Sequence, residues 1–250
     1  MLESWHNEVA VVTGAAGSIG GAIADRMAKL GARVAGSDLS AELAVTARQR
    51  MDVVNVTDPT AVDRWIGSVS DTWGAPSIAV ICAGVSRAGR LVELSDADWR
   101  EVLAINLDGA FYTARAAIQA MLAAGRGGRL VFVGSWAAHA PHPHIGAYSI
   151  SKAALRSLCQ TLALDHAKDG ILVNEVAPGI VDAGLSRELF RRDPALMTRT
   201  MTAVPTKLLI TPEDVARDVV FLASPENLHT TGAALITDGG LSLASLMNPG

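Results

Sequence analysis

Short runs rich in Val, Ile and Ala recur along this chain of 250 residues, and segments with a helical pattern fill the intervals between them. The runs are almost continuous in apolar residues, which is typical of strands buried on both faces of a parallel sheet. We therefore predict an α/β fold, a doubly wound sheet of seven parallel strands flanked by helices on both faces. The predicted strands are Val9–Thr13, Arg33–Ser37, Met51–Val54, Ile78–Cys82, Arg129–Gly134, Leu172–Val176 and Ala234–Ile236.

One segment departs from this rhythm. Between Pro178 and Pro212 the chain is longer than a single helix requires. Ligands of open α/β sheets bind beyond the carboxyl ends of the strands, so residues at about 182–211 are well placed to form a lid over a substrate. A surface helical hairpin without a gating role is the alternative. Since α/β architectures of about 250 residues often form one unit, we expect residues 1–250 to be a single domain.

The composition argues against several classes of protein. Half of the residues are apolar, 18% are charged and the net charge is −4, which disfavours both disorder and a surface that coats nucleic acid. We find no signal-peptide pattern and no apolar run near the roughly 18 residues of a membrane span, so we expect a cytoplasmic protein. Cys82 and Cys159 lie far apart, and their spacing predicts neither a disulfide framework nor a zinc site.

The first predicted strand runs directly into a glycine-rich turn, TGAAGSIG from Thr13 to Gly20, and a helix follows. Glycines permit a tight turn and close approach to a pyrophosphate, while the helix N-terminus offers unpaired N–H groups and the positive end of its dipole. Tight strand-to-helix turns also use glycine for steric reasons alone. The order of strand, turn and helix favours a nucleotide-binding role.

Asp38 stands at the end of the second predicted strand, eighteen residues after Gly20. A carboxylate there can accept hydrogen bonds from both hydroxyls of an adenosine ribose, and it repels the additional phosphate of NADP. The other interpretation is an N-cap for a helix that begins near Ser40, although Ser40 is the better cap candidate. We favour the ribose role, which predicts NAD as the cofactor.

Tyr148 and Lys152 are four residues apart at the start of a predicted helix, so their side chains share one face. A phenol has a pKa of about 10, and a neighbouring ammonium and a positively charged nicotinamide lower such a value, so the tyrosine can exchange protons. Tyr-x-x-x-Lys is also a common pair on exposed helices. Ser135 favours the functional interpretation, because it follows the fifth predicted strand and can hold a substrate oxygen in the same crevice.

These residues together resemble the classical short-chain dehydrogenase/reductase family over essentially the whole chain. The resemblance extends to Asn106 in INLDG, Asn174, Pro178-Gly179, Thr231-Gly232 and Asp238-Gly239-Gly240. It implies a single Rossmann-type dinucleotide-binding and catalytic domain. In such enzymes the asparagine helps to hold a water that connects the lysine to solvent, which implies a catalytic tetrad of Asn106, Ser135, Tyr148 and Lys152.

The turn, Asp38 and the resemblance together imply a set of cofactor contacts along the carboxyl ends of the strands. They are Gly14, Gly17, Ser18, Ile19, Gly20, Asp38, Asn55, Val56, Ala83, Gly84, Tyr148, Lys152, Pro178, Gly179 and Val181. The resemblance also implies a homotetramer, paired through the segments around Trp99–Leu122 and Ser149–Ala167.

Some positions depart from the family pattern. Ser18 replaces the usual second glycine of the turn, and ICAG at Ile81–Gly84 replaces Asn-Asn-Ala-Gly, so stability there is expected to come from packing. Asn55 replaces a common aspartate, and Ala183 stands where a threonine often meets the nicotinamide carboxamide. None of these changes removes a catalytic group.

Three histidines lie between the proposed serine and tyrosine: His139, His142 and His144. Prolines restrict the backbone on both sides of His142, and no carboxylate or cysteine joins the group, so we predict no metal site. Trp136 and His139 are instead expected to line the substrate pocket with Ser135 and Tyr148. The other two histidines are expected on its rim or as ordinary loop residues.

The lid-like segment is more basic than the rest of the chain. Its basic residues are Arg187, Arg191, Arg192, Arg199 and Lys207. A basic lid attracts a carboxylate, phosphate or sulfonate, but such residues more often form the solvated face of a helix, and we favour that interpretation.

The sequence thus predicts an NAD(H)-dependent oxidoreductase that interconverts a secondary alcohol, such as a polyol, sugar or hydroxy acid, and a ketone, with Tyr148 as acid and base. One alternative is a 3-oxoacyl carrier-protein or acyl-CoA reductase, in which the basic lid and Arg126 or Arg129 receive an acidic carrier; Asp38 argues against the NADP-linked carrier-protein form. A non-catalytic NAD-binding scaffold or sensor is the alternative from another class, and it has no need of the tetrad. We expect no nucleic-acid or membrane partner.

Overall fold

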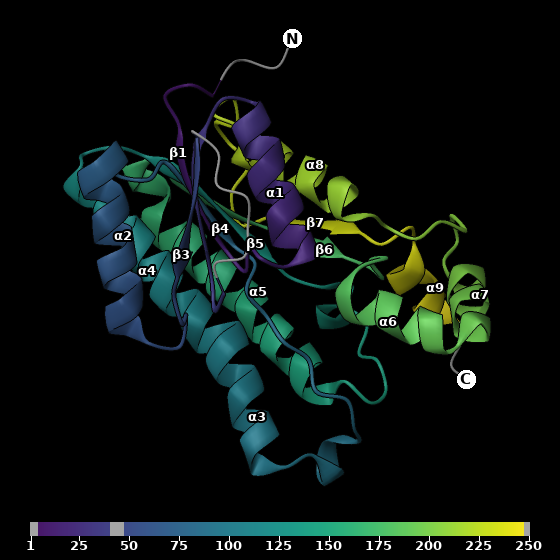
Figure 1. Cartoon of the computed structure of the whole chain (residues 1–250). Helices are drawn as coiled ribbons and strands as arrows, with labels where there is room; N and C mark the ends of the chain where they lie inside the picture. Colours follow the sequence, from purple (N-terminus) through teal and green to yellow (C-terminus); the bar gives the residue numbers. More distant parts are fainter. Residues whose placement is uncertain (1–4, 41–47, 248–250) are drawn as a thin grey trace.

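The computed structural model describes residues 5–40 and 48–247. Its core is a sheet of seven parallel strands in the order β3-β2-β1-β4-β5-β6-β7 (Figure 1). The strands are β1 (Val9–Thr13), β2 (Arg33–Asp38), β3 (Gln49–Val53), β4 (Ile78–Ile81), β5 (Gly128–Val133), β6 (Ile171–Pro178) and β7 (Ala234–Thr237). The predicted fold class is confirmed. Because the strand order reverses between β1 and β4, a ligand crevice is expected at the carboxyl ends of these strands.

The predicted strand boundaries differ from the observed ones by up to two residues. β6 continues to Pro178 instead of ending at Val176, because β7 pairs with its last four residues, from Glu175 opposite Ala234 to Pro178 opposite Thr237. β3 begins at Gln49, where it pairs with Val34 of β2.

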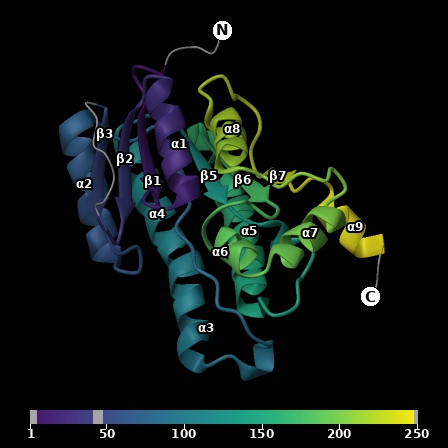
Figure 2. The same cartoon turned by 45° about the vertical axis from the view of Figure 1, so that its right-hand side comes forward.

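Helices cover both faces of the sheet, which explains the continuous apolar runs of its central strands (Figures 1 and 2). One face, which includes Ala10 and Val12 of β1, packs against α1 (Ser18–Lys29) and α8 (Pro212–Ala223). The other face, which includes Val9 and Val11, packs against α2 (Pro59–Trp73), α4 (Gly109–Ala123) and α5 (Gly146–His166).

The remaining helices lie towards the carboxyl ends of the strands (Figure 2). They are α3 (Asp96–Leu103), α6 (Gly184–Arg192), α7 (Pro194–Ala203) and α9 (Leu241–Met247). The predicted lid-like segment contains α6 and α7. An isolated parallel bridge between Val181 and Ile210 joins its two ends, and the Asp182 N–H donates to the Ile210 carbonyl at 2.8 Å. Within the described ranges, no helix has both the length and the hydropathy that a membrane span requires.

Candidate active site

The turn between β1 and α1 forms a cradle that only glycine permits. Gly14 has φ +69°, in the left-handed region, and a Cβ there would lie 2.9 Å from the backbone N and Cα of Ala83. A Cβ on Gly20 would overlap the carbonyl of Gly14. α1 begins after Gly17 without a side-chain cap, so the first amides of the helix, those of Ser18 and Ile19 among them, are available to an anion. The turn therefore fits a pyrophosphate.

Asp38 ends β2 beside this turn. One carboxylate oxygen accepts from the Ala16 N–H at 3.1 Å, and the other accepts from the Leu39 N–H at 2.7 Å. A negative charge therefore lies next to the cradle. The alternative N-cap role concerns a helix in residues 41–47, which lie outside the described residues.

Thr13 connects the ends of β1 and β4. Its buried hydroxyl oxygen accepts from the N–H groups of Cys82 and Ala83, at 3.0 and 3.2 Å. Ile81 and Cys82 of the ICAG segment pack against the two core clusters, as expected, and these hydrogen bonds hold the backbone in addition. The sequence places Thr13 at the end of the first strand and the start of the turn, and its pattern gives no sign of this role.

Asn106 lies in a single π-helical turn, Ala104–Asp108, between α3 and α4. Its Oδ1 accepts from the Val85 N–H at 2.8 Å, and its Nδ2 donates to the Val85 carbonyl at 2.9 Å and to Ser151 Oγ at 3.0 Å. The Ser151 hydroxyl in turn donates to the Tyr148 carbonyl at 2.7 Å. Asn106 thus joins the loop after β4 to the N-terminal part of α5.

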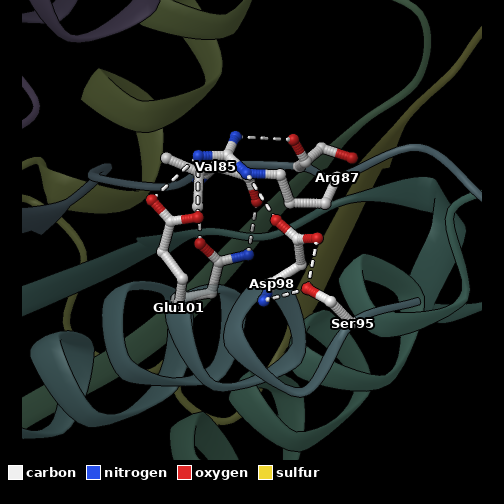
Figure 3. A network of polar contacts seen from close by, with 7 residues as sticks. Val85, Arg87, Ser95, Asp98 and Glu101 are labelled. Atoms are coloured by element: carbon white, nitrogen blue, oxygen red, sulfur yellow. Dashed lines mark hydrogen bonds and ion pairs between the residues drawn. The ribbon is translucent and has the colours of Figure 1, made fainter.

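The loop after β4 is further fixed by the ion pairs of Arg87 (Figure 3). The guanidinium contacts Asp98 at 3.5 Å and Glu101 at 2.7 Å, both on α3. The Gly89 N–H donates to the His144 carbonyl at 2.8 Å, which attaches the same loop to the segment before α5. The loop that borders the crevice is therefore held on both sides.

Ser135, Tyr148 and Lys152 reach this edge from two segments. Lys152 is buried, its Nζ donates to the Val133 carbonyl at 2.8 Å, and it lies 5.6 Å from the centre of the Tyr148 ring. Ser135 Oγ accepts from the Ala137 N–H at 3.1 Å, which leaves its own O–H free to donate to a ligand. A Cβ on Gly84 would lie 3.5 Å from Lys152 Nζ, so this glycine borders the same group.

The other candidate cofactor residues follow β3 and β6. Asn55 Oδ1 accepts from the N–H and the hydroxyl of Thr57, at 3.0 and 2.8 Å, and Val56 packs against Gly109. The N–H of Gly179, after Pro178, donates to Thr237 at 2.8 Å, and Val181 forms the bridge to Ile210 described above. Pro178 is the last residue of β6, and the others lie beyond the strand ends, but the side-chain oxygen of Asn55 already accepts hydrogen bonds within its own loop.

Trp136 and His139, which were both expected to line the substrate pocket, have different surroundings. Trp136 is buried in a small cluster with Ala140, Val204 and Leu241, and the ring of His142 lies edge-on to it at 5.7 Å. The indole thus packs against the end of α7 and against α9. His139 Nε2 is buried and has no hydrogen-bond partner in the described ranges. Burial lowers the pKa of His139, as does Arg156, while Asp238 raises it.

Two arginines of the basic lid form ion pairs with nearby aspartates. Arg187 pairs with Asp182 at 3.2 Å and Arg199 with Asp193 at 2.9 Å; the two arginines are exposed and the two aspartates are partly exposed. These pairs favour the solvated-face interpretation. The side chain of Arg192 lies outside the described residues. No group of three or more potential metal ligands occurs in residues 5–40 and 48–247.

The two cysteines are expected to react slowly in the folded protein. Burial raises the pKa of Cys82 to about 11, although the positive charge of Lys152 opposes this shift. Burial and the negative charge of Glu175 raise the pKa of Cys159 to about 12. Both thiols should therefore be protonated at pH 8 and unreactive towards iodoacetamide until the protein unfolds, as mass spectrometry of native and urea-treated samples would show. Rapid labelling of the native protein would contradict this prediction.

Comparison with known proteins agrees with this geometry. A family described as enoyl-(acyl carrier protein) reductase matches residues 14–242. The chain belongs to the short-chain dehydrogenase/reductase family. It is an oxidoreductase, and the family generally uses NAD or NADP.

Its relatives act on different substrates. The chain is 31% identical over 242 residues to 3-oxoacyl-(acyl-carrier-protein) reductase of Vibrio cholerae, covering 94% of this chain and 98% of that one. It is 32% identical over 253 residues to (3R)-3-hydroxyacyl-CoA dehydrogenase of Canis lupus familiaris, covering 94% and 96%. A crystal structure of a putative 2-deoxy-D-gluconate 3-dehydrogenase from Agrobacterium tumefaciens with bound NADP superposes with a TM-score of 0.87 at 31% identity, covering 95% of this chain and 97% of that one.

Proposed function

We propose that this chain is an NAD(H)-dependent oxidoreductase that interconverts a secondary alcohol and a ketone. The observation that carries the proposal is that Lys152 and Tyr148 of α5 lie beside the end of β5, where Ser135 follows, and that the glycine cradle borders the same strand ends. A bound nicotinamide would accept the hydride in alcohol oxidation and donate it in ketone reduction.

Each residue of the site has a distinct role in this proposal. Ser135 Oγ–H donates to the substrate oxygen and holds it in place. Tyr148 Oη takes the hydroxyl proton during oxidation and returns it during reduction. Lys152 Nζ, fixed by the Val133 carbonyl, provides the positive charge that assists the phenol. Asn106 holds the loop after β4 and the start of α5 together.

The choice of NAD over NADP rests on Asp38. Its carboxylate accepts from Ala16 of the turn, so it lies where an adenosine ribose would reach, and it would repel a ribose phosphate. The related structure from Agrobacterium tumefaciens contains NADP, which makes cofactor preference the sharpest test.

A second candidate function is reduction of a 3-oxoacyl thioester, and the two enzymes named above favour it. Of the carrier contacts expected for it, Arg126 and Arg129 lie at the amino end of β5, opposite Ser135, so they do not support this function. Arg129 also donates to the Pro225 carbonyl at 3.3 Å. An acyl carrier would therefore approach the basic lid, the other expected contact.

The first experiment compares NAD with NADP in a panel of polyols, sugars, hydroxy acids and 3-hydroxyacyl thioesters, for the wild type and Asp38→Asn. We expect the wild type to prefer NAD and Asp38→Asn to lose about tenfold or more of that preference, since hydrogen bonds to charged groups contribute about 1.5–3 kcal/mol. Asp25→Asn, an exposed change on α1, is the control. Preference of the wild type for NADP would contradict the NAD assignment, and cofactor binding without turnover would favour the scaffold.

We also propose that α4 and α5 pair between subunits of a homotetramer. Their exposed apolar residues, Phe111, Leu122, Ile150 and Leu164, support this pairing. The segment at about 182–211 is proposed to act as the lid, and residues 1–250 as one domain.

A further inference from the structure

Glu175 is a carboxylate in the middle of a buried strand. It lies in β6, all eight residues of which are buried, and its own exposure is 1%. Acidic side chains are almost never fully buried unless they are paired, because an isolated charge loses its hydration. An apolar residue at this position would simply continue the packing of the strand. The presence of an acid therefore requires a separate explanation.

The contacts of Glu175 join the two segments that carry the proposed catalytic groups. Its Oε2 lies 3.5 Å from Arg156 Nη1, and Arg156 is one turn after Lys152 on α5. On the other side, the carboxylate occupies the space beside Gly134, where a Cβ would overlap Oε1. Gly134 directly precedes Ser135. The carboxylate thus lies between α5 and the end of β5, two elements that Figure 1 shows side by side.

The charge of Glu175 does not stabilise the folded protein. Burial raises its pKa, against the lowering effects of Arg156, Lys152 and the Ser135 amide. Cys159 of α5 is a further titratable group that interacts with Glu175. Because the net effect on Glu175 is a raised pKa, its ion pair with Arg156 does not offset the free-energy cost of burying the charge. Oε1 also lacks a hydrogen-bond partner within the described part of the chain.

We propose that Glu175 and Arg156 are a positioning pair that holds the end of β5, and with it Ser135, in register with Tyr148 and Lys152 of α5. This inference rests on the proposed function, because Ser135 must hold the substrate oxygen where Tyr148 can exchange its proton. Glu175 acts through Gly134 and α5 and does not touch the substrate. Small displacements of such groups reduce rates strongly, since proton and hydride transfer require close alignment.

The test uses Glu175→Gln, which keeps the shape and removes the charge, together with Arg156→Met and the double variant. NADH titration counts the competent sites, so that kcat is expressed per site. We expect kcat to fall about tenfold or more in each single variant, with no further fall in the double variant and unchanged NADH affinity. Asp96→Asn, which removes the charge of an exposed ion pair with Arg100 on α3, is the matched control and should keep wild-type kcat.

Thermal unfolding separates positioning from a purely structural role. A raised folded-state pKa contributes stability that is present below the unfolded pKa and lost as the pH rises through the folded value. Relative to the wild type, Glu175→Gln should therefore gain in Tm from pH 5 to pH 8, even though its kcat is lower. Wild-type kcat in Glu175→Gln, additive losses in the double variant, or kcat and Tm that fall together at pH 8 would each overturn the proposal.

Failure of the proposed function can be distinguished from failure of the positioning pair. If the wild type turns over no alcohol, ketone or thioester, the oxidoreductase assignment to these substrates fails. The unfolding free energies of the two single variants and the double variant then decide whether the pair exists. A non-zero coupling between Glu175 and Arg156 supports the pair, and a zero coupling overturns it.

Discussion

Tyr148→Phe is expected to lower kcat by about 10²–10⁴-fold, because general acid and base catalysis by a positioned side chain contributes about that factor. The substitution removes only Oη. The ring, which Lys152 approaches at 5.6 Å, and the Tyr148 carbonyl, which accepts from Ser151, are both kept. NADH affinity and Tm should therefore change little. Stopped-flow measurement of nicotinamide absorbance with the best substrate of the panel would give the rate of the chemical step.

The chain provides its own control for this experiment. Its other tyrosine, Tyr112, is partly buried on α4 and packs beside Phe111 and Arg115. Tyr112→Phe removes the same atom from a side chain that packs beside Phe111 and Arg115 of α4, and it should keep wild-type kcat. Equal losses in the two variants, or full activity in Tyr148→Phe, would show that Tyr148 does not exchange the proton.

Gly20→Ala is expected to weaken NADH binding by at least about tenfold and to destabilise the protein by about 1–3 kcal/mol, the usual cost of overpacking. The new methyl group would overlap the Gly14 carbonyl, which is backbone and can move only if the turn opens. Opening the turn displaces the amides that would face the pyrophosphate. Fluorescence titration with NADH and thermal unfolding measure the two effects.

Gly67→Ala is the matched control for this variant. Gly67 lies on the exposed side of α2, and a Cβ there has no neighbour within 4 Å. Replacement of a glycine within a helix by alanine stabilises by about 0.5–1 kcal/mol, so this variant should bind NADH normally and unfold at a slightly higher temperature. Normal NADH binding by Gly20→Ala would contradict the assignment of the turn to the cofactor.

The strands could be predicted because burial on both faces leaves a local trace. The run from Val9 to Thr13 is apolar at almost every position, and such runs recur for the other central strands. The end of β6 was missed because Pro178 resembles a turn residue. Its pairing with Thr237 of β7 depends on a segment far away in the sequence.

The placement of Ser135, Tyr148 and Lys152 at the carboxyl end of β5 could be predicted from local patterns. Tyr148 and Lys152 share a helix, and Ser135 follows a strand, so local spacing was sufficient. Thr13 and Val85 were missed because their roles depend on which distant backbone groups they meet. Glu175 did leave a signal, since it is the charged residue in the apolar sequence of β6, but its partner Arg156 is identified only by the packing of α5.

The bridge between Val181 and Ile210 has a consequence for how substrate preference can diversify. Because these two residues are neighbours in space, the intervening chain leaves and rejoins the framework at almost one point. A loop closed in this way can lengthen at a small entropic cost, about 0.6 kcal/mol for each doubling. The segment with α6 and α7 can therefore change in length or sequence without moving its two ends. Insertions, or replacement by the corresponding segment of a related enzyme, would leave β6, β7 and the proton-transfer residues in place.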